Sequence, residues 1–162
     1  MSYTVLRGRW CNIFGLNAHA VRQEKSVDSK DSFYEELEQD VDHLPKYHTK
    51  ILLGDFKEKL GREDIFKLTV GNESLYQDIN NNGVRIVNVA TSKNLTVKIT
   101  MFPHRKIHKY TWSSPDGKIH NQMDHTLIDR RWHSSVLEVR SFRGAVILIT
   151  VWWLQNLGKD WQ

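Results

Sequence analysis

Two amphipathic helical patterns, set between short strand-like segments, constrain this sequence most. Apolar residues recur at helical spacing at Phe33, Leu37, Val41 and Leu44, and acidic residues take the opposite face. A second pattern of this kind runs over 84–94. Strand-like segments lie at 10–17, 51–53, 95–100, 110–112, 122–128 and 136–142. Strands that alternate with helices in this way predict an α/β layered domain.

Local signals mark where these segments begin and end. Asp28 or Ser29 is the predicted N-cap of the first helix, and Pro45 stops it. A turn is predicted over 114–117, Ser-Pro-Asp-Gly, because Pro presets φ and Gly accepts positive φ. This turn should join the strand at 110–112 to the strand at 122–128. Residues 54–82 are mostly polar and show little periodicity, and a loop of this length is often functional.

Composition narrows the class of protein. The 162 residues, 40% hydrophobic and 26% charged, suit one folded domain. A single cysteine, Cys11, excludes an internal disulfide framework and suits a reducing compartment. The longest apolar run, 145–154, is shorter than the roughly 20 residues of a membrane span, and no signal-peptide pattern opens the chain. We therefore expect a protein of the nucleus or cytoplasm, neither secreted nor in a membrane.

Three polar residues are candidates for a functional site, and one of them, Asp55, falls where a layered fold would place a ligand. Asp55 follows a buried strand, His19 follows the first strand, and Asp124 stands within an apolar strand pattern. The carboxyl ends of strands are where α/β folds bind ligands. Each residue also has an ordinary explanation. Gly-Asp often serves a turn, a lone His is usually surface or core filler, and an Asp like Asp124 is typical of an exposed face of an edge strand.

The segment 98–133 is basic and aromatic. It holds seven Lys and Arg against three Asp, a difference equal to the formal net charge of the chain, +4. The side chains we expect to contact DNA are Arg105, Lys106, Lys109, Tyr110 and Trp112. Basic groups with interleaved aromatic rings suit phosphate contact and base stacking. An ordinary solvated face is the alternative, and the sequence indicates no particular protein partner.

Four short motifs occur in an order that resembles a known family. They are Asn17-Ala18-His19-Ala20, Ile51-Leu52-Leu53-Gly54-Asp55-Phe56, Tyr110-Thr111-Trp112 with the turn after it, and Asn121-Gln122-Met123-Asp124-His125. Over residues 6–144 they resemble the endonuclease/exonuclease/phosphatase superfamily, relatives of deoxyribonuclease I. The likeness is strongest to the endonucleases of RTE/BovB-type non-LTR retrotransposons and to the vertebrate craniofacial development protein 2 family. It implies a four-layer α/β sandwich with a Mg²⁺-dependent phosphodiesterase site that acts on DNA.

The resemblance also implies roles for individual residues. Asp55 matches an Asp that helps to activate the attacking water, and it is the residue expected to bind Mg²⁺. Asp124 matches an acid that orients a catalytic His. His19 stands near the place of the scissile phosphate, and Trp112 stands where relatives often contact DNA.

The sequence departs from the family at catalytic positions. Lys57 replaces the Asn of the Gly-Asp-x-Asn motif, and an ammonium there competes with a metal for Asp55. The family's first Asn and its metal-binding Glu have no match here, and 145–162 holds no Ser-Asp-His. We therefore expect a partial four-layer sandwich over 6–144 that lacks its first half and last strand. Residues 145–162 are then a non-family tail, which we interpret as a frameshifted end.

Three interpretations of function stay open. The first is a remnant of a metal-dependent DNA endonuclease of retrotransposon origin, with impaired or lost catalysis. The second is a non-catalytic DNA- or protein-binding module that uses 98–133. The third is an active Mg²⁺-dependent endonuclease, which the departures at the catalytic positions oppose.

Overall fold

A five-stranded mixed sheet is the centre of the computed structural model of this chain. The structure describes residues 1–8, 12–20, 25–56, 59–61, 67–74, 76–103, 105, 112–122, 124–142 and 146–151. In spatial order the strands are β1 (Ser2–Leu6), β2 (Ile13–His19), β3 (Thr49–Asp55), β7 (Asp124–Asp129) and β4 (Leu95–Val97). The β2–β3 pair is parallel and the other neighbouring pairs are antiparallel.

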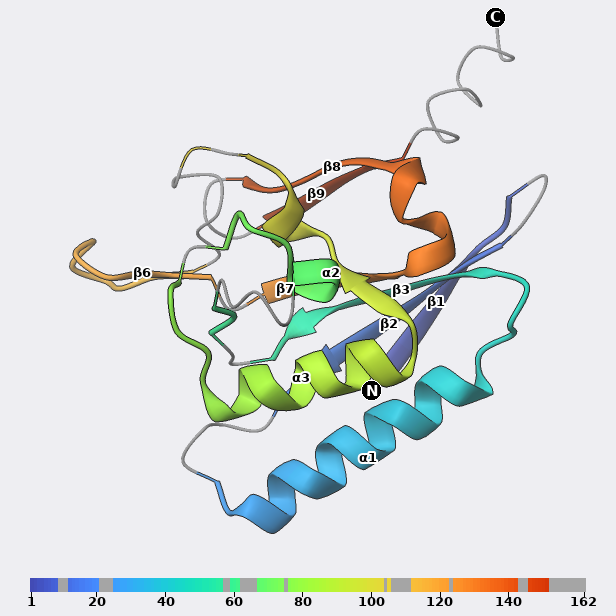
Figure 1. The fold of residues 1–162 in the computed structure, drawn as a ribbon, viewed down its shortest axis with the longest axis horizontal. Helices are drawn as coiled ribbons and strands as arrows, with labels where there is room; N and C mark the ends of the chain where they lie inside the picture. The colour runs from blue at the N-terminus through green and yellow to red at the C-terminus, as the bar shows by residue number, and fades with distance from the viewer. Residues whose placement is uncertain are drawn as a thin grey trace, which may run out of the picture.

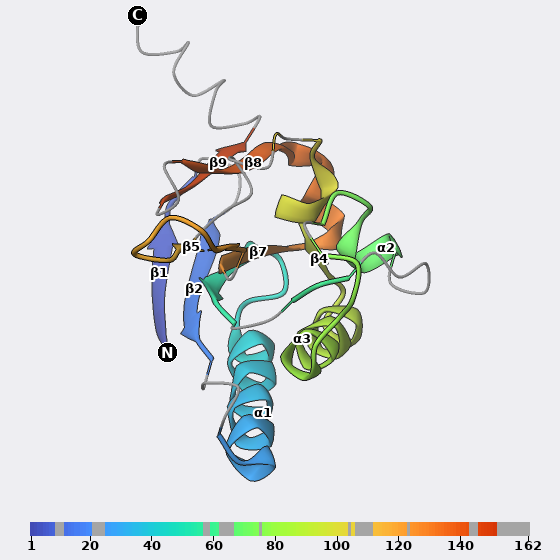
Figure 2. The ribbon, with the colours of Figure 1, turned by 90° about the vertical axis from the view of Figure 1, so that its left-hand side faces the viewer.

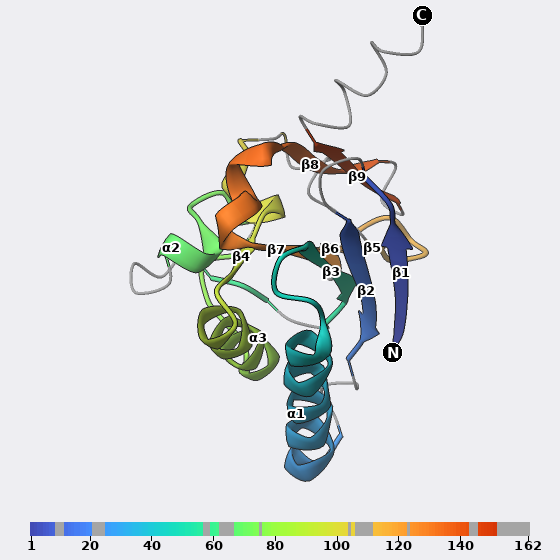
Figure 3. The same cartoon turned by 90° about the vertical axis from the view of Figure 1, so that its right-hand side faces the viewer.

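Helices cover one face of this sheet and a hairpin lies over the other. The helices α1 (Val27–His43) and α3 (Asn81–Ser92) run side by side below the sheet in Figure 1. The strands β8 (Val136–Phe142) and β9 (Val146–Val151) form an antiparallel pair on the opposite side, as Figures 2 and 3 show. The described part of the chain thus has three layers, which confirms the expected α/β fold and a partial sandwich.

Shorter elements connect these layers. They are α2 (Lys67–Val70), the 3₁₀ turns η2 (Ile99–Met101) and η4 (Arg130–Ser135), and the strands β5 (Trp112–Ser113) and β6 (His120–Asn121). The helix α2 lies within the long polar segment 54–82, which is therefore not a continuous loop. None of the described helices is both long and apolar enough to span a membrane.

The hydrophobic core lies between the sheet and its helices. Leu52 of β3 and Leu127 of β7 are register partners at the centre of the sheet, and both are fully buried. Helix residues pack over them, among them Leu37, Val41, Ile86, Val87 and Ala90. Burying a side chain of this size contributes roughly 1.5–3 kcal/mol. The apolar stripes seen in the sequence are therefore the surfaces that hold α1 and α3 on the sheet.

The first helix differs from its prediction at its start. Ser26 is the N-cap, because its hydroxyl accepts a hydrogen bond from the Ser29 N–H at 3.3 Å. The prediction of Asp28 or Ser29 as the cap was therefore wrong by two or three residues. Its buried stripe includes Tyr34, whose hydroxyl donates to a carbonyl of α3, while Phe33 is only partly buried.

Two predicted strands have other bounds. The first strand begins at Ile13 and runs to His19, and the predicted start at Trp10 lies outside the described residues. The segment 95–100 is a strand only as far as Val97, after which the backbone turns into η2. There Thr100 donates from its hydroxyl to the Val97 carbonyl at 3.1 Å, which favours the turn over an extended chain.

The predicted pairing around the 114–117 turn was also wrong in part. The turn forms, with Gly117 at a φ of +69°, but it joins β5 to β6. The strand expected over 122–128 is β7, which starts at Asp124 and lies between β3 and β4. Residues 136–142 form the predicted strand, and its partner β9 falls within the segment expected to be a non-family tail.

Candidate functional site

Three of the predicted site residues lie side by side at the ends of neighbouring strands. His19 of β2 is the register partner of Asp55 of β3, and Asp55 is the partner of Asp124 of β7. Register partners project to the same face of a sheet, and neighbouring strands lie about 4.8 Å apart. The sheet therefore assembles these residues, 36 and 69 positions apart in the chain, into one row. We call His19, Asp55 and Asp124 the strand-end row.

The row faces away from the helices. Phe14 and Leu16 of β2 line a groove with residues of α1, so they mark the helix face of the sheet. Side chains alternate along a strand, so His19 lies on the other face together with its register partners, and at the strand end it also lines a groove with Phe33 and Glu36 of α1. His19 is exposed at the rim, while Asp55 and Asp124 are half-buried. The row is thus accessible from solvent on the side of the sheet that carries β8 and β9.

Gly54 allows β2 and β3 to approach each other at this end of the sheet. A Cβ atom at Gly54 would overlap the carbonyl oxygen of Ala18 and lie 2.9 Å from its carbonyl carbon. Just beyond, the Ala20 N–H donates to the Asp55 carbonyl at 2.8 Å. The Gly-Asp pair therefore serves the close contact of two strands and ends a strand; it does not form a turn.

Asp124 lies on an interior strand. The alternative of an exposed edge strand is wrong, because β7 has neighbours on both sides. The next residue, His125, points to the helix face and is fully buried. Burial disfavours its charged form and lowers the pKa of His125 to about 4, although the negative charge of Asp55 partly opposes this. His125 is therefore neutral near pH 7, and it belongs to the core beneath the row.

Tyr76 holds the chain that leads into β7, a role that the sequence did not indicate. Its hydroxyl donates to the Asn121 side-chain carbonyl at 3.2 Å and accepts from the Gln122 N–H at 3.0 Å. Both contacts lie within three residues of Asp124. Tyr76 lies in the mostly polar segment 54–82, where no motif or periodicity singled it out. Tyr76 is a positioning residue for the row.

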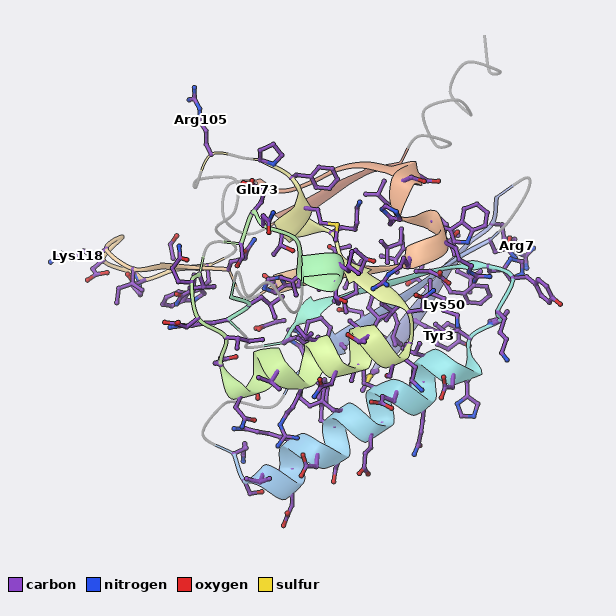
Figure 4. All side chains as sticks on the ribbon, viewed as in Figure 1. Tyr3, Arg7, Lys50, Glu73, Arg105 and Lys118 are labelled. Carbon is purple, nitrogen blue, oxygen red and sulfur yellow. The ribbon has the colours of Figure 1, made fainter. Side chains whose placement is uncertain are left out.

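The predicted DNA contacts are only partly described. Trp112 is 42% exposed, and Arg105 is exposed as well. Figure 4 shows Arg105 and Lys118 on the side of the molecule opposite Tyr3 and Arg7. In Figure 1 the strand β3 points toward that same side, where the β5–β6 hairpin projects. The other predicted contacts, Lys106, Lys109 and Tyr110, lie outside the described residues, as does the altered family position Lys57.

Among the described residues of the basic segment 98–133, some cations do not present a free charge to solvent. Lys98 is only 5% exposed, and its ammonium lies 5.0 Å from the centre of the Phe102 ring. Burial lowers the pKa of Lys98. Arg131 instead pairs with Asp129 at 2.7 Å. Charge counted along the sequence therefore overstated the cations that can meet a nucleic acid.

The donors in the row suit a hard cation only in part. Asp55 and Asp124 offer carboxylate oxygens, the ligands that Mg²⁺ prefers, and Mg²⁺ often takes one or two carboxylates and completes its shell with water and phosphate. Among the described residues, no group of three or more His, Cys, Asp or Glu side chains could hold a metal ion. A metal at the row would therefore depend on phosphate oxygens and water as well as protein.

Comparisons with known proteins agree on the fold. The chain is 32% identical over 113 residues to craniofacial development protein 2 of Tragulus javanicus and of Bos taurus, which covers 70% of this chain and 19% of each relative. It thus spans about a fifth of the length of these relatives. No family model matches.

Solved structures with the same fold process nucleic acids or come from retrotransposons. The 3′-5′ exonuclease NExo from Neisseria meningitidis is 19% identical with a TM-score of 0.53, covering 85% of this chain and 56% of its own. A structure of NExo bound to a product DNA hairpin gives 0.58 at 16% identity, over 92% and 64%. The endonuclease domain of TRAS1, a telomere-specific non-LTR retrotransposon, gives 0.57 at 12% identity, over 92% and 62%.

Proposed function

Because this chain fits the endonuclease/exonuclease/phosphatase superfamily in fold and sequence, we propose that it is a DNA-binding remnant of a phosphodiesterase with impaired hydrolysis. One observation carries the proposal: the strand-end row brings His19, Asp55 and Asp124 together on an accessible face. Acid–base groups and carboxylates gathered at strand ends suit chemistry on a phosphate ester.

Each residue of the row has a proposed part. Asp55 and Asp124 would hold Mg²⁺, which when bound supplies positive charge beside a phosphate. His19, at the exposed rim, would donate a hydrogen bond to a phosphate oxygen. The close contact at Gly54 would hold β2 beside β3, and the Tyr76 hydrogen bonds would hold the chain that leads into β7.

The proposed impairment follows from one substitution in the sequence. Lys57 stands two residues after Asp55, where the resembling family has an Asn that holds the attacking water. An ammonium donates hydrogen bonds but accepts none, and it competes with a cation for the carboxylate. We therefore propose that DNA reaches the row and that its hydrolysis there is slow or absent.

The position of DNA can be tested by removing negative charge from the row. In EDTA, we expect Asp55→Asn and Asp124→Asn each to tighten binding of a short duplex, since a carboxylate repels a nearby phosphate. The expected gain is about 1 kcal/mol, or roughly fivefold in dissociation constant at low salt. Fluorescence anisotropy at several salt concentrations measures it. The matched control is Asp28→Asn, an exposed acid on the first turn of α1.

The same titration distinguishes binding at the strand-end row from binding through the β5–β6 hairpin. Trp112 is exposed at the base of the β5–β6 hairpin, and this favours a module that binds through the hairpin alone. In that case Trp112→Ala weakens binding, while the two row variants behave like Asp28→Asn. Equal affinities for wild type and both row variants would therefore contradict the proposed site.

A further inference from the structure

The strand β1 is an edge strand with an unusual amount of exposed apolar surface. It pairs with β2 and has no neighbour on its other side within the described residues. All five of its residues are exposed, and Tyr3 is 70% exposed. An edge strand presents a row of backbone N–H and C=O groups that can pair with another strand. Apolar side chains on such an edge indicate a docking surface.

A groove runs between this edge and α1. It has a volume of about 550 Å³, and its apolar lining includes Tyr3, Phe14, Leu16, Leu44 and Pro45. Two acidic side chains of α1, Glu36 and Asp40, also line it. Glu36 lines a second groove as well, with Met1 and Ser2, so the acidic side chain lies at the Met1 end of β1. A partner strand should therefore bring apolar side chains and a cation to this end.

The opposite end of the same edge carries that cation. Arg7 follows β1 directly and is exposed. Figure 4 shows Arg7 and Tyr3 on the same side of the molecule. Odd-numbered residues of β1 share the helix face, because Tyr3 is the register partner of Leu16 and Val5 of Phe14. The edge thus has a cation at one end, the carboxylates of Glu36 and Asp40 near the α-ammonium of Met1 at the other, and apolar side chains between them.

We propose that β1 pairs antiparallel with β1 of a second copy of this chain, about a two-fold axis at Thr4. In this register Tyr3 faces Val5 of the other copy, twice, and extends the apolar helix face. Arg7 faces Met1 of the other copy and so lies beside its Glu36. Two-fold pairing is self-complementary, so each charge and each apolar residue meets its counterpart on the other copy. The product is one sheet that continues across two chains.

Cross-linking tests the register directly. Residues on the two-fold axis of an antiparallel pair have Cα atoms about 4.5–5.5 Å apart, which a disulfide can bridge. With Cys11 replaced by Ser, we expect Thr4→Cys to form a covalent dimer under mild oxidation. Ser2→Cys is the matched control, because Ser2 faces Leu6 of the other copy and the two Ser2 residues are therefore too far apart to form a disulfide. Equal cross-linking of both variants, or none for Thr4→Cys, would overturn the proposal.

Sedimentation tests the surface without a covalent bond. We expect Val5→Lys and Arg7→Glu each to raise the dimer dissociation constant at least about tenfold, because edge charges oppose strand pairing and Arg7 loses its acidic counterpart. Adding Glu36→Arg to Arg7→Glu should restore the wild-type constant. Val27→Lys, at an exposed apolar residue of α1, is the control. A wild-type chain that stays monomeric up to about 1 mM would contradict a second copy as the occupant.

Discussion

Replacing Gly54 by Ala is expected to lower the free energy of unfolding by about 2–3 kcal/mol. The added Cβ would overlap the Ala18 carbonyl, a backbone group that cannot rotate away. The strands β2 and β3 would have to separate where they carry His19 and Asp55. The variant should therefore lose stability and, with it, the geometry of the strand-end row. Urea unfolding followed by circular dichroism measures the first effect.

Gly15→Ala is the matched control for this experiment. Gly15 lies on β2 in the same sheet, but a Cβ there would meet its nearest neighbour, the Thr4 carbonyl, at an ordinary 3.7 Å. Alanine loses less conformational freedom on folding than glycine, by roughly 0.5–1 kcal/mol, so this variant should be neutral or more stable. If both variants unfold at the same urea concentration as wild type, the close contact at Gly54 does not exist.

Acidification is expected to cost about 3 kcal/mol of stability through His125 alone. Burial holds the pKa of His125 at about 4 in the folded state, against an ordinary value near 6.5. Between these two pH values His125 is protonated in the unfolded chain but neutral in the folded chain. The part of the free energy of unfolding that depends on His125 is therefore fully present above pH 6.5. It decreases as the pH drops through 6.5, and it is lost near pH 4.

The variant His125→Phe isolates this effect. Phenylalanine fills a similar volume in the buried position but does not titrate, so its unfolding free energy should fall much less between pH 7 and pH 4. Urea titrations at four pH values, with wild type and variant in the same buffers, give the free energy of unfolding of each protein as a function of pH. If the free energy of unfolding falls equally with pH in both proteins, His125 does not cause the loss of stability.

The sequence predicted the layers better than the pairing of the strands. The apolar stripes of α1 and α3 and the apolar run Ile51–Leu53 supply much of the buried surface, although Val84 of α3 is exposed. Pairing depends on contacts between distant segments, which periodicity does not report. The strand β7 shows this, because it joins β3 and β4 in the central sheet instead of pairing with β5. The edge strand β1 was missed, although Tyr3 and Val5 alternate with Ser2 and Thr4, because the segment is short and all of its residues are exposed.

The candidate site could be predicted as a set of residues but not as a geometry. Position after a strand indicated His19 and Asp55, an acid within an apolar strand pattern indicated Asp124, and the family resemblance indicated all three; the registers place them in one row. Tyr76 was missed because a hydroxyl that bridges Asn121 and the Gln122 N–H leaves no periodic pattern. Lys98 was wrongly counted among the cations available to DNA, because nothing in the sequence indicates that this charged residue is buried.

Nicking of supercoiled plasmid by the purified chain tests the proposed function most directly. Wild type and Asp55→Asn are compared with and without Mg²⁺, at protein concentrations where both bind DNA. We expect both proteins to bind the plasmid. Because Lys57 replaces the family's Asn, we expect Mg²⁺ to give wild type no more nicking than Asp55→Asn shows. Mg²⁺-dependent nicking by wild type that disappears in Asp55→Asn would contradict the impairment and identify an active endonuclease.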